Sequence, residues 1–353
     1  MNVLIVGAGP TGLTVAIELA RRGVSPTIIE RREAPSPLSR AVGITPRSLE
    51  TLSHSGAAER LIAEGIAMDG LAVYYGKKLT LEMQLRSDRT FHPNLVCLPQ
   101  DRTEAIMIDT LDALGTIPRF GVQLEEFTET SDGVVAKFDN GEEAVFDHVV
   151  GADGIRSTVR EKVGIAYPGV DLEQQWSIAD VDLNGWPHPN SLTVVQAGRG
   201  KVVVAVPLGG SRFRLVASSD KALPAMPLPL DVTKIRREGA FTISVRKAET
   251  YSTGRVHLAG DAAHCHSPVG GRGMNLGIAD AAELARRMVE GGLDGYTAAR
   301  HEDTLNARTV TERGRLMSTG PNVARRIAFR ALVTAASKLA PIQRKIGSFI
   351  VEF

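Results

Sequence analysis

The sequence predicts a mixed α/β protein in which a unit with a parallel sheet is interleaved with an antiparallel sheet and followed by a helical tail. Three observations carry this prediction. Near the N-terminus, two short apolar runs flank a glycine-rich turn and an amphipathic helix, as in a β-α-β unit. Apolar and polar residues alternate over residues 176–217, as in antiparallel strands. Apolar residues then recur at helical spacing over residues 297–353.

The composition is that of an ordinary globular protein. The chain has 353 residues, of which 43% are hydrophobic and 23% charged, and its net charge is +1, so we expect no nucleic-acid partner. Its two cysteines, Cys97 and Cys265, have no metal-ligand spacing around them, which indicates free thiols and no metal site. The first strand begins at Asn2, which leaves no room for a signal peptide, and no apolar stretch reaches the roughly 18 residues of a membrane span. We therefore expect a cytoplasmic monomer or homodimer without an integral membrane segment.

The first 30 residues predict a cradle for a dinucleotide. Its elements are a strand at Asn2–Val6, the turn Gly7-Ala8-Gly9-Pro10-Thr11-Gly12, a helix at Leu13–Arg22 and a strand at Pro26–Glu30. Gly7 permits the tight turn, Gly9 lets the backbone approach a pyrophosphate, and Gly12 lets helix and strand pack closely. The free amides and the positive dipole end of the helix suit the phosphate charge.

Glu30 ends the second strand, where a carboxylate accepts hydrogen bonds from a ribose diol. Because it also repels a 2′-phosphate, the cradle favours the adenosine of FAD or NAD over that of NADP, without choosing between those two. Arg31 and Arg32 follow, either to accommodate a phosphate or as part of a solvated loop. The candidate cofactor residues of this unit are Gly7, Gly9, Pro10, Thr11, Gly12, Glu30 and Arg31.

A second glycine-rich turn follows a predicted strand at Val145–Val150 and reads Gly151-Ala152-Asp153-Gly154. Arg156 and Arg160 then form a cationic corner on a helix. The alternative is a plain helix start with Asp153 as the N-cap and both arginines solvated.

A third turn, Gly260-Asp261, follows a strand at Val256–Ala259, and its carboxylate suits a hydroxylated ribityl chain. Residues 267–275 then open a helix that runs to about Glu290. Free amides at such a helix start suit the N1–C2=O edge of a reduced, anionic flavin. Three such turns in one chain indicate a single extended cofactor, FAD.

The three motifs together resemble those of the class A, single-component flavoprotein monooxygenases, the aromatic hydroxylase family of the para-hydroxybenzoate hydroxylase type. The resemblance covers about residues 1–300 and is most specific at Gly260–His264 and Pro268–Asn275. It implies that Arg40 and Gln100 contact FAD, although by sequence alone either could be a surface residue. It also assigns His264 to the packing of the turn, so we identify no catalytic acid or base. Further cofactor residues implied by the resemblance are Asp153, Asp261, Pro268, Gly271, Gly273, Met274 and Asn275, with the backbone of Pro268 and Gly271 supporting the flavin edge.

The resemblance also implies an activity. FAD would be bound tightly but not covalently, NADPH or NADH would be a transient reductant, and O₂ would be the second substrate. The implied reaction is hydroxylation or epoxidation of a phenolic, aromatic or polyketide-like molecule through a C4a-hydroperoxyflavin. The main alternative is an FAD-dependent reductase of isoprenoid double bonds, because the same three motifs serve it. A halogenase lacks support because Trp176 and Trp186 do not have the spacing of its Trp-x-Trp signature, and a non-catalytic binding subunit would not need the Pro268–Asn275 loop.

These patterns divide the chain into three parts. The predicted FAD-binding domain covers 1–69, 91–165 and 251–296, the substrate-binding β-sheet domain covers 70–90 and 166–250, and the helical segment covers 297–353. Trp176 and Arg214 are candidates for the substrate wall, with a structural role as the alternative. The basic tail could pack on the FAD domain, on a second subunit or on a membrane surface.

Overall fold

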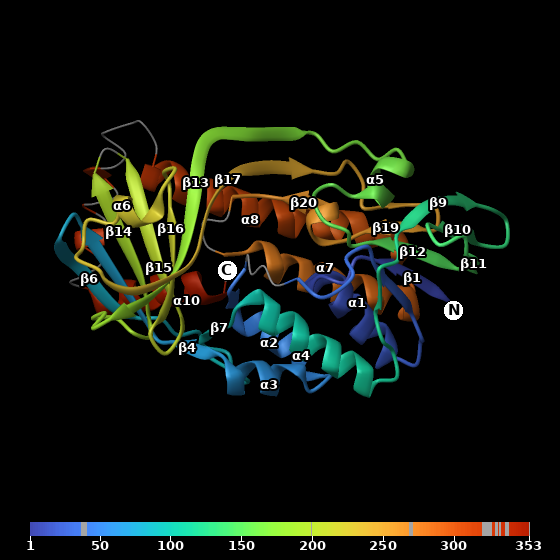
Figure 1. Cartoon of the computed structure of the whole chain (residues 1–353), viewed down its shortest axis with the longest axis horizontal. Coiled ribbons are helices and arrows are strands. Elements are labelled where there is room, and N and C mark those ends of the chain that lie inside the picture. The colour runs from blue at the N-terminus through green and yellow to red at the C-terminus, as the bar shows by residue number, and fades with distance from the viewer. Residues whose placement is uncertain are drawn as a thin grey trace.

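The computed structural model describes residues 1–36, 41–198, 200–267, 271–319, 327–328, 331, 333–335 and 339–352. Two bodies lie along the long axis, one built on a six-stranded sheet and the other on an eight-stranded sheet (Figure 1). This arrangement confirms the predicted mixed α/β fold with a parallel and an antiparallel sheet. No helix among these residues is long and apolar enough to span a membrane.

The six-stranded sheet has the order β18-β19-β12-β1-β2-β8, and every pair from β19 to β8 is parallel. All four residues of β1, Val-Leu-Ile-Val, are buried, as expected of a strand covered on both faces. The strands are β1 (Val3–Val6), β2 (Thr27–Glu30), β8 (Arg119–Phe120), β12 (His148–Gly151), β18 (Ser252–Thr253) and β19 (Val256–Leu258).

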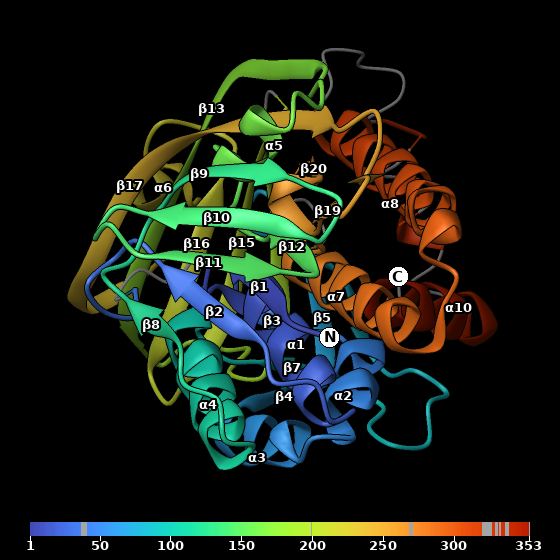
Figure 2. The ribbon, with the colours of Figure 1, turned by 90° about the vertical axis from the view of Figure 1, so that its right-hand side faces the viewer.

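Helices cover one face of this sheet and a small antiparallel sheet covers the other (Figure 2). The covering helices are α1 (Pro10–Ala20), α4 (Gln100–Ala113) and α7 (Gly273–Glu290), and the small sheet is β9 (Leu124–Glu129), β10 (Val134–Phe138) and β11 (Glu143–Phe146). The remaining elements of this body are short: β3 (Gly43–Ile44), α2 (Pro46–Ser53), α3 (Ala57–Glu64), β4 (Ile66–Met68), β7 (Leu95–Cys97), α5 (Thr158–Lys162), η1 (Gly260–Ala262) and η2 (Leu293–Gly295).

One predicted strand is divided in the structure. Instead of a single strand at Val145–Val150, β11 ends at Phe146 and β12 begins at His148. The reason is a change of partner, since Phe146 pairs with Val134 of the small sheet while His148 pairs with Val3 of the parallel sheet.

The eight-stranded sheet has the order β20-β17-β13-β16-β15-β14-β5-β6 and is antiparallel except where β14 pairs with β5. Its strands are β5 (Gly70–Tyr75), β6 (Lys78–Gln84), β13 (Gly169–Asn184), β14 (Ser191–Gly198), β15 (Lys201–Gly209), β16 (Arg212–Ala217), β17 (Asp231–Lys247) and β20 (His264–Cys265). The long strands β13 and β17 cross from one body to the other (Figure 1). Because β20 follows the third motif directly, this sheet reaches into the range 251–296, and the exact domain boundaries stay a prediction.

The two faces of this sheet have different coverings. On the outer face, Phe213 and Leu215 pack with Ala222 of the short helix α6 (Ala222–Ala225). On the inner face, Val206 and Met83 pack with Val351 of α10 (Ala340–Glu352). The inner face therefore points toward the C-terminal helices, among them α8 (Tyr296–Thr319) and α10.

Gly347 sets how closely α10 approaches the sheet. A methyl group added at Gly347 would lie 2.9 Å from the carbonyl oxygen of Gln84 and 3.3 Å from Cε of Met83. The basic tail thus packs on its own chain through this helix.

We expect Gly347→Val to force α10 away from β6 and to lower the free energy of unfolding by about 1–3 kcal/mol. Denaturant unfolding with FAD at a fixed concentration measures the change. Gly239→Val is the matched control, because an added Cβ at Gly239 meets nothing within 4 Å. Equal stability of the two variants would contradict the close packing of α10.

Candidate cofactor site

The three glycine motifs meet at one edge of the parallel sheet. Strands β1, β12 and β19 are parallel neighbours, so their carboxyl ends, each followed by a motif, lie side by side. A methyl group added at Gly7, whose φ is +107°, would lie 2.5 Å from the carbonyl oxygen of Ala152 in the second motif. One added at Gly260 would overlap the hydroxyl of Thr11. The first motif therefore touches both of the others.

Thr11 joins the first motif to the third by packing. Its side chain lies against Gly260 and also against Gly277 on α7, where an added methyl group would overlap it. Gly12 is equally constrained, because an added Cβ would overlap the carbonyl oxygen of Gly7. These contacts support the packing role expected of Gly12 and direct the side chain of Thr11 toward α7.

Gly9 is different, because an added Cβ there meets nothing within 4 Å. It is the N-cap residue of α1, Pro10 follows it at the first helical position, and no side chain caps the helix. The amides of the first helical turn thus have no side-chain acceptor, which leaves them available to an anion.

Glu30 lies beside this helix start. Its Oε2 accepts a hydrogen bond from the amide of Ala8 at 3.1 Å, and its Oε1 accepts one from Nε of Arg32 at 2.9 Å. Burial opposes the ionisation of Glu30, but the hydrogen bonds from Arg32 and Ala8 outweigh it and lower the pKa. The sequence left two roles open for Arg31 and Arg32, a contact to phosphate or a place in a solvated loop. In the structure Arg32 pairs with Glu30, whereas Arg31 is exposed.

Gln100 is the first residue of α4 and lies next to the segment after Arg40. Its Oε1 accepts from the amide of Ala41 at 3.0 Å, and its Nε2 donates to Oε1 of Glu104 at 2.8 Å. Glu104 is 2% exposed, and burial raises its pKa. Arg40 itself lies outside the described residues.

In the second motif, Asp153 is not the N-cap of α5. That position belongs to Ser157, whose hydroxyl accepts from the amide of Arg160 at 3.0 Å, while Oδ2 of Asp153 accepts from the amide of Val159 at 3.2 Å. Burial raises the pKa of Asp153.

The two arginines of the second motif have different surroundings. Arg156 precedes α5 and is exposed, whereas Arg160 is buried. Arg160 Nη1 donates to the carbonyl of Ala262 at 3.0 Å, and the guanidinium lies 3.9 Å from the ring centre of Tyr167. The alternative in which both arginines are solvated is therefore wrong for Arg160. The hydrogen bond from Arg160 to Ala262 connects the second motif to the third.

In the third motif, Asp261 is exposed within η1, and the position of an added Cβ on Gly273 lies 4.0 Å from its Oδ1. Asp261 is thus placed at the start of α7. Gly271, with φ +64°, has open space around it, and α7 begins without a side-chain cap. Met274 is 9% exposed and packs into the core of this body. Pro268 lies outside the described residues.

Asn275 fastens this loop to the segment around Thr45. Its Oδ1 accepts from the amide of Thr45 at 2.9 Å, and its Nδ2 donates to the carbonyls of Gly43 at 2.9 Å and Gly271 at 3.1 Å. The side chain is therefore committed to protein partners, and it positions Gly271 relative to Gly43.

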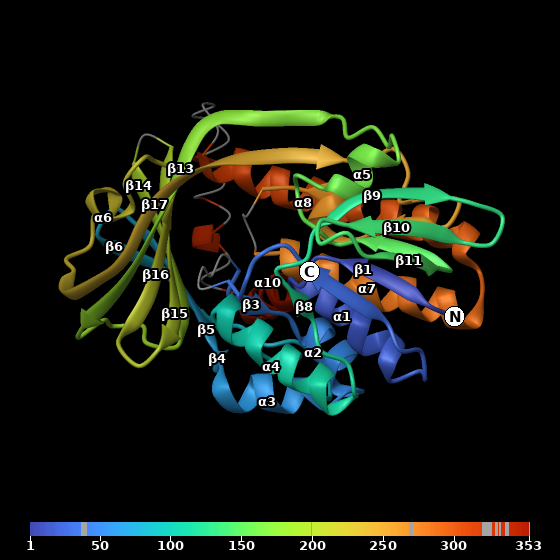
Figure 3. The same ribbon diagram turned by 45° about the vertical axis from the view of Figure 1, so that its right-hand side comes forward.

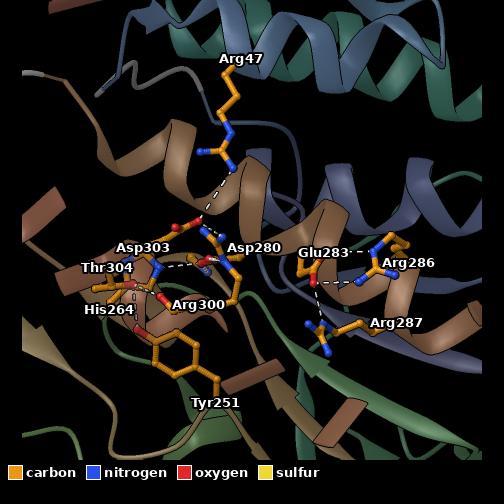
Figure 4. Close-up of polar contacts among 11 residues, drawn as sticks. Arg47, Tyr251, His264, Asp280, Glu283, Arg286, Arg287, Arg300, Asp303 and Thr304 are labelled. Atoms are coloured by element: carbon orange, nitrogen blue, oxygen red, sulfur yellow. Dashed lines mark hydrogen bonds and ion pairs between the residues drawn. The ribbon is translucent and has the colours of Figure 1, made fainter. Parts of the chain in front are cut away.

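Asp280, on α7, and its partner Arg300, on α8, were not identified from the sequence as site residues. The side chain of Asp280 is the centre of a buried polar network. The fully buried carboxylate of Asp280 accepts from the amide of Gly260 at 3.0 Å. It also accepts from Nε2 of His264 at 2.6 Å and from Nε of Arg300 at 2.6 Å (Figure 4). Burial opposes its ionisation, yet the charges of His264 and Arg300 hold the pKa of Asp280 at about 2. Only the helical spacing of Asp280 within α7 hinted at an inward position.

This network continues to α2. Arg300 also pairs with Asp303, whose Oδ2 lies 3.9 Å from Nη2 of Arg47 (Figure 4). His264, expected to be structural, does lie in packing, but as the buried partner of a carboxylate. Over the described part of the chain, no group of three or more His, Cys, Asp or Glu residues could hold a metal ion.

The two candidates for the substrate wall are buried in the eight-stranded sheet. Arg214 is 1% exposed and forms a bidentate pair with Asp180, at 2.7 and 2.8 Å. It lies opposite Val206 in the register, so it belongs to the inner face. Trp176 is 2% exposed and packs with Val202 and Ile243. These contacts place both residues in the sheet packing.

The site fits an elongated cofactor with phosphates and hydroxyl groups. Open space at Gly9, an uncapped helix start behind it and the carboxylate of Glu30 suit a pyrophosphate and a ribose. At the third motif, the exposed Asp261 and the uncapped start of α7 suit a hydroxylated chain and an electron-rich ring edge.

Comparisons with known proteins agree with this fit. A family model described as "FAD binding domain" matches residues 1–222 and 223–304. The 6-methylpretetramide 4-monooxygenase of Streptomyces rimosus is 33% identical over 370 residues, which cover 98% of this chain and 64% of that protein. The rifampicin monooxygenase of Streptomyces venezuelae is 34% identical over 360 residues, which cover 92% and 74%. The crystal structure of p-nitrophenol 4-monooxygenase from Pseudomonas putida superposes with a TM-score of 0.88 at 25% identity, covering 98% of this chain and 96% of that one.

We expect Asp280→Asn to lower the free energy of unfolding by about 3–5 kcal/mol, because it leaves the Arg300 cation without its buried partner. The folded pKa of Asp280 lies below its ordinary value of 3.8, so its stabilisation is complete above pH 3.8 and is lost as the pH falls through about 2. Unfolding curves of wild type and variant, measured from pH 7 down to 2, should therefore converge at acidic pH.

The control is Asp109→Asn, which removes an exposed ion pair with Arg60 and should cost less than about 1 kcal/mol. If the two variants lost similar amounts of unfolding free energy at pH 7, the buried network would not be what stabilises the third motif.

Proposed function

This chain belongs to the FAD-binding domain family that includes the single-component aromatic hydroxylases, and from that premise we propose that it is an FAD-dependent monooxygenase. In the proposed reaction NADPH or NADH is the reductant, one atom of O₂ enters the substrate and the other leaves as water. The chain spans 64% of the length of the first relative named above and 74% of the second.

The observation that carries the proposal is the convergence of the three motifs, with one uncapped helix start at the first motif and another after the third. The amides near Gly9 would hold the pyrophosphate of FAD, and Glu30 its adenosine ribose. Asp261 would hold the ribityl chain, and Gly271 with the start of α7 would support the flavin edge. FAD supplies the redox and oxygen chemistry when it is bound.

The task of this chain is then to bind, orient and shield. Asn275 fixes Gly271 against Gly43, which sets the geometry of the loop at the flavin edge. His264 is committed to Asp280 and has 1% exposure, so it is not placed to exchange protons with a substrate. These roles explain why the site needs no nucleophile and no metal ligand set.

The proposed substrate is a phenolic or polyketide-like molecule. The relatives are named for 6-methylpretetramide, rifampicin and pentachlorophenol. These names favour oxygen insertion over the reductase alternative. The inner face of the eight-stranded sheet would form the substrate wall, with Trp176 and Arg214 as its candidates. We further propose a cytoplasmic location, which suits the two free cysteines.

The direct test is oxygen incorporation. We expect the purified protein to be yellow or to take up FAD, and to oxidise NADPH or NADH while one atom of ¹⁸O₂ enters a product. Mass spectrometry after incubation with p-nitrophenol, pentachlorophenol, rifampicin and anhydrotetracycline detects it. A colourless protein that binds no added FAD would contradict the proposal. Flavin reduction without oxygen consumption would support the alternative, an FAD-dependent reductase.

Glu30→Gln tests the cofactor contact separately. Loss of a charged acceptor for the ribose should weaken FAD binding about tenfold, as measured by flavin fluorescence quenching. Glu59→Gln, at an exposed position on α3, is the control and should leave the affinity unchanged. An unchanged affinity in the Glu30 variant would remove this residue from the cofactor site.

A further inference from the structure

A cavity of about 910 Å³ lies between α10, α2 and the loop that follows β6. We call it the cationic pocket, because five basic side chains and one acidic side chain among the described residues line it. They come from three separate segments of the chain: Arg47, Arg86, Asp88, Arg89, Arg344 and Lys345.

Three of the five cations have no acidic partner among the described residues. Arg89 pairs with Glu50, and Arg47 lies 3.9 Å from Asp303. In contrast, Arg86, Arg344 and Lys345 are exposed and make no hydrogen bond or ion pair with another described residue. Such an excess of positive charge favours a ligand with several negative charges. A ligand with phosphate groups fits better than one with a single carboxylate, because each phosphate carries more negative charge.

The first turn of α10 adds to the positive potential of the pocket. Pro341, the second residue of the helix, lines the pocket, so the positive end of the helix dipole faces it. Ser348, further along the same helix, also lines it and offers a hydroxyl group.

Helix α10 links this pocket to the loop proposed for the flavin edge. Arg272, which precedes α7, donates through Nη2 to the carbonyl of Ile350 on α10 at 3.0 Å. Ile350 is six residues beyond Arg344, a distance of about 9 Å along the helix. Figure 3 shows α10 between the eight-stranded sheet and the helices of the other body. A ligand in the pocket is therefore close to the proposed flavin site.

The cradle around Glu30 is not available to the phosphates of the nicotinamide dinucleotide that acts as reductant. Its carboxylate repels a 2′-phosphate, and the proposed role of the cradle is to hold the adenosine of FAD. The nicotinamide dinucleotide must then bind its phosphates elsewhere on this chain.

We propose that the cationic pocket binds the phosphate groups of the nicotinamide dinucleotide that reduces the flavin. The identity of this ligand rests on the proposed function. NADPH carries a 2′-phosphate in addition to the diphosphate that it shares with NADH, so the pocket selects NADPH by charge. The attraction is electrostatic and weakens as the salt concentration rises.

The test uses 2′,5′-ADP, which carries the phosphates of the NADPH adenosine half but cannot reduce a flavin. Calorimetry on the FAD-loaded protein should show binding of 2′,5′-ADP, and weaker binding of 5′-AMP. In Arg344→Gln/Lys345→Gln the affinity for 2′,5′-ADP should fall about tenfold, equivalent to about 1.4 kcal/mol. The KM for NADPH should rise to a similar degree, with smaller changes in kcat and in the KM for NADH.

Two further variants separate the pocket from general effects. Arg86→Gln removes a cation from the loop after β6, so its loss of affinity could not come from a damaged α10. Lys77→Gln/Lys78→Gln removes two exposed charges at the turn between β5 and β6, outside the pocket, and should leave the affinity unchanged.

The outcomes separate this inference from the proposed function. Unchanged affinity for 2′,5′-ADP in both pocket variants, or an equal loss in the Lys77/Lys78 control, would overturn the pocket assignment. Binding of inorganic pyrophosphate without binding of 2′,5′-ADP would overturn the identification of the ligand as a nicotinamide dinucleotide. If the protein oxidises NADPH and the pocket variants keep its KM, the inference fails while the function stands. If 2′,5′-ADP binds as expected but no NADPH is oxidised, the phosphate site stands and the function fails.

Discussion

The third motif depends on one buried carboxylate, that of Asp280. A charge with no exposure to solvent is stable only when donors replace the water it has lost, and here three do so. One donor is the backbone amide of Gly260 itself, and the others are His264 and Arg300. The motif, helix α7 and helix α8 are thus fixed by a shared partner, and a shift of any one of them would break at least one of these three contacts.

The second constraint is the close approach of backbones at the edge of the parallel sheet. Gly7, Gly12, Gly260 and Gly277 each lie where a side chain would overlap a neighbour, and Thr11 fills the space between two of them. The three motifs therefore meet as parts of the folded scaffold. A long cofactor that binds along this edge needs little ordering of the protein, which favours tight binding.

The elements with a local signal could be predicted from the sequence. The buried strand β1, the glycine turn and α1 follow from hydrophobic periodicity and glycine spacing, and the four strands β13 to β16 of the antiparallel sheet follow from alternation. The long strand β17, which pairs with β13, was not predicted from it. The missed features are set by distant partners. The break at Asp147 reflects a change of sheet, the burial of Arg160 depends on Ala262, and the role of Asp280 depends on residues on two other elements. A helix pattern shows that Asp280 faces inward, but it cannot show what meets it there.

Helix α10 shows how such distant contacts join the two bodies. Gly347 seats it on β6, and Ile350, near its C-terminal end, accepts from Arg272 of the loop before α7. Burial lowers the pKa of Arg272 to about 10, so the side chain remains charged at neutral pH. A cation is stabilised at the negative, C-terminal end of a helix, while the opposite end of α10 presents its positive pole to the pocket beside Pro341. The same helix dipole therefore favours a protein cation on the cofactor side and an anion on the pocket side, and movement of α10 would weaken both.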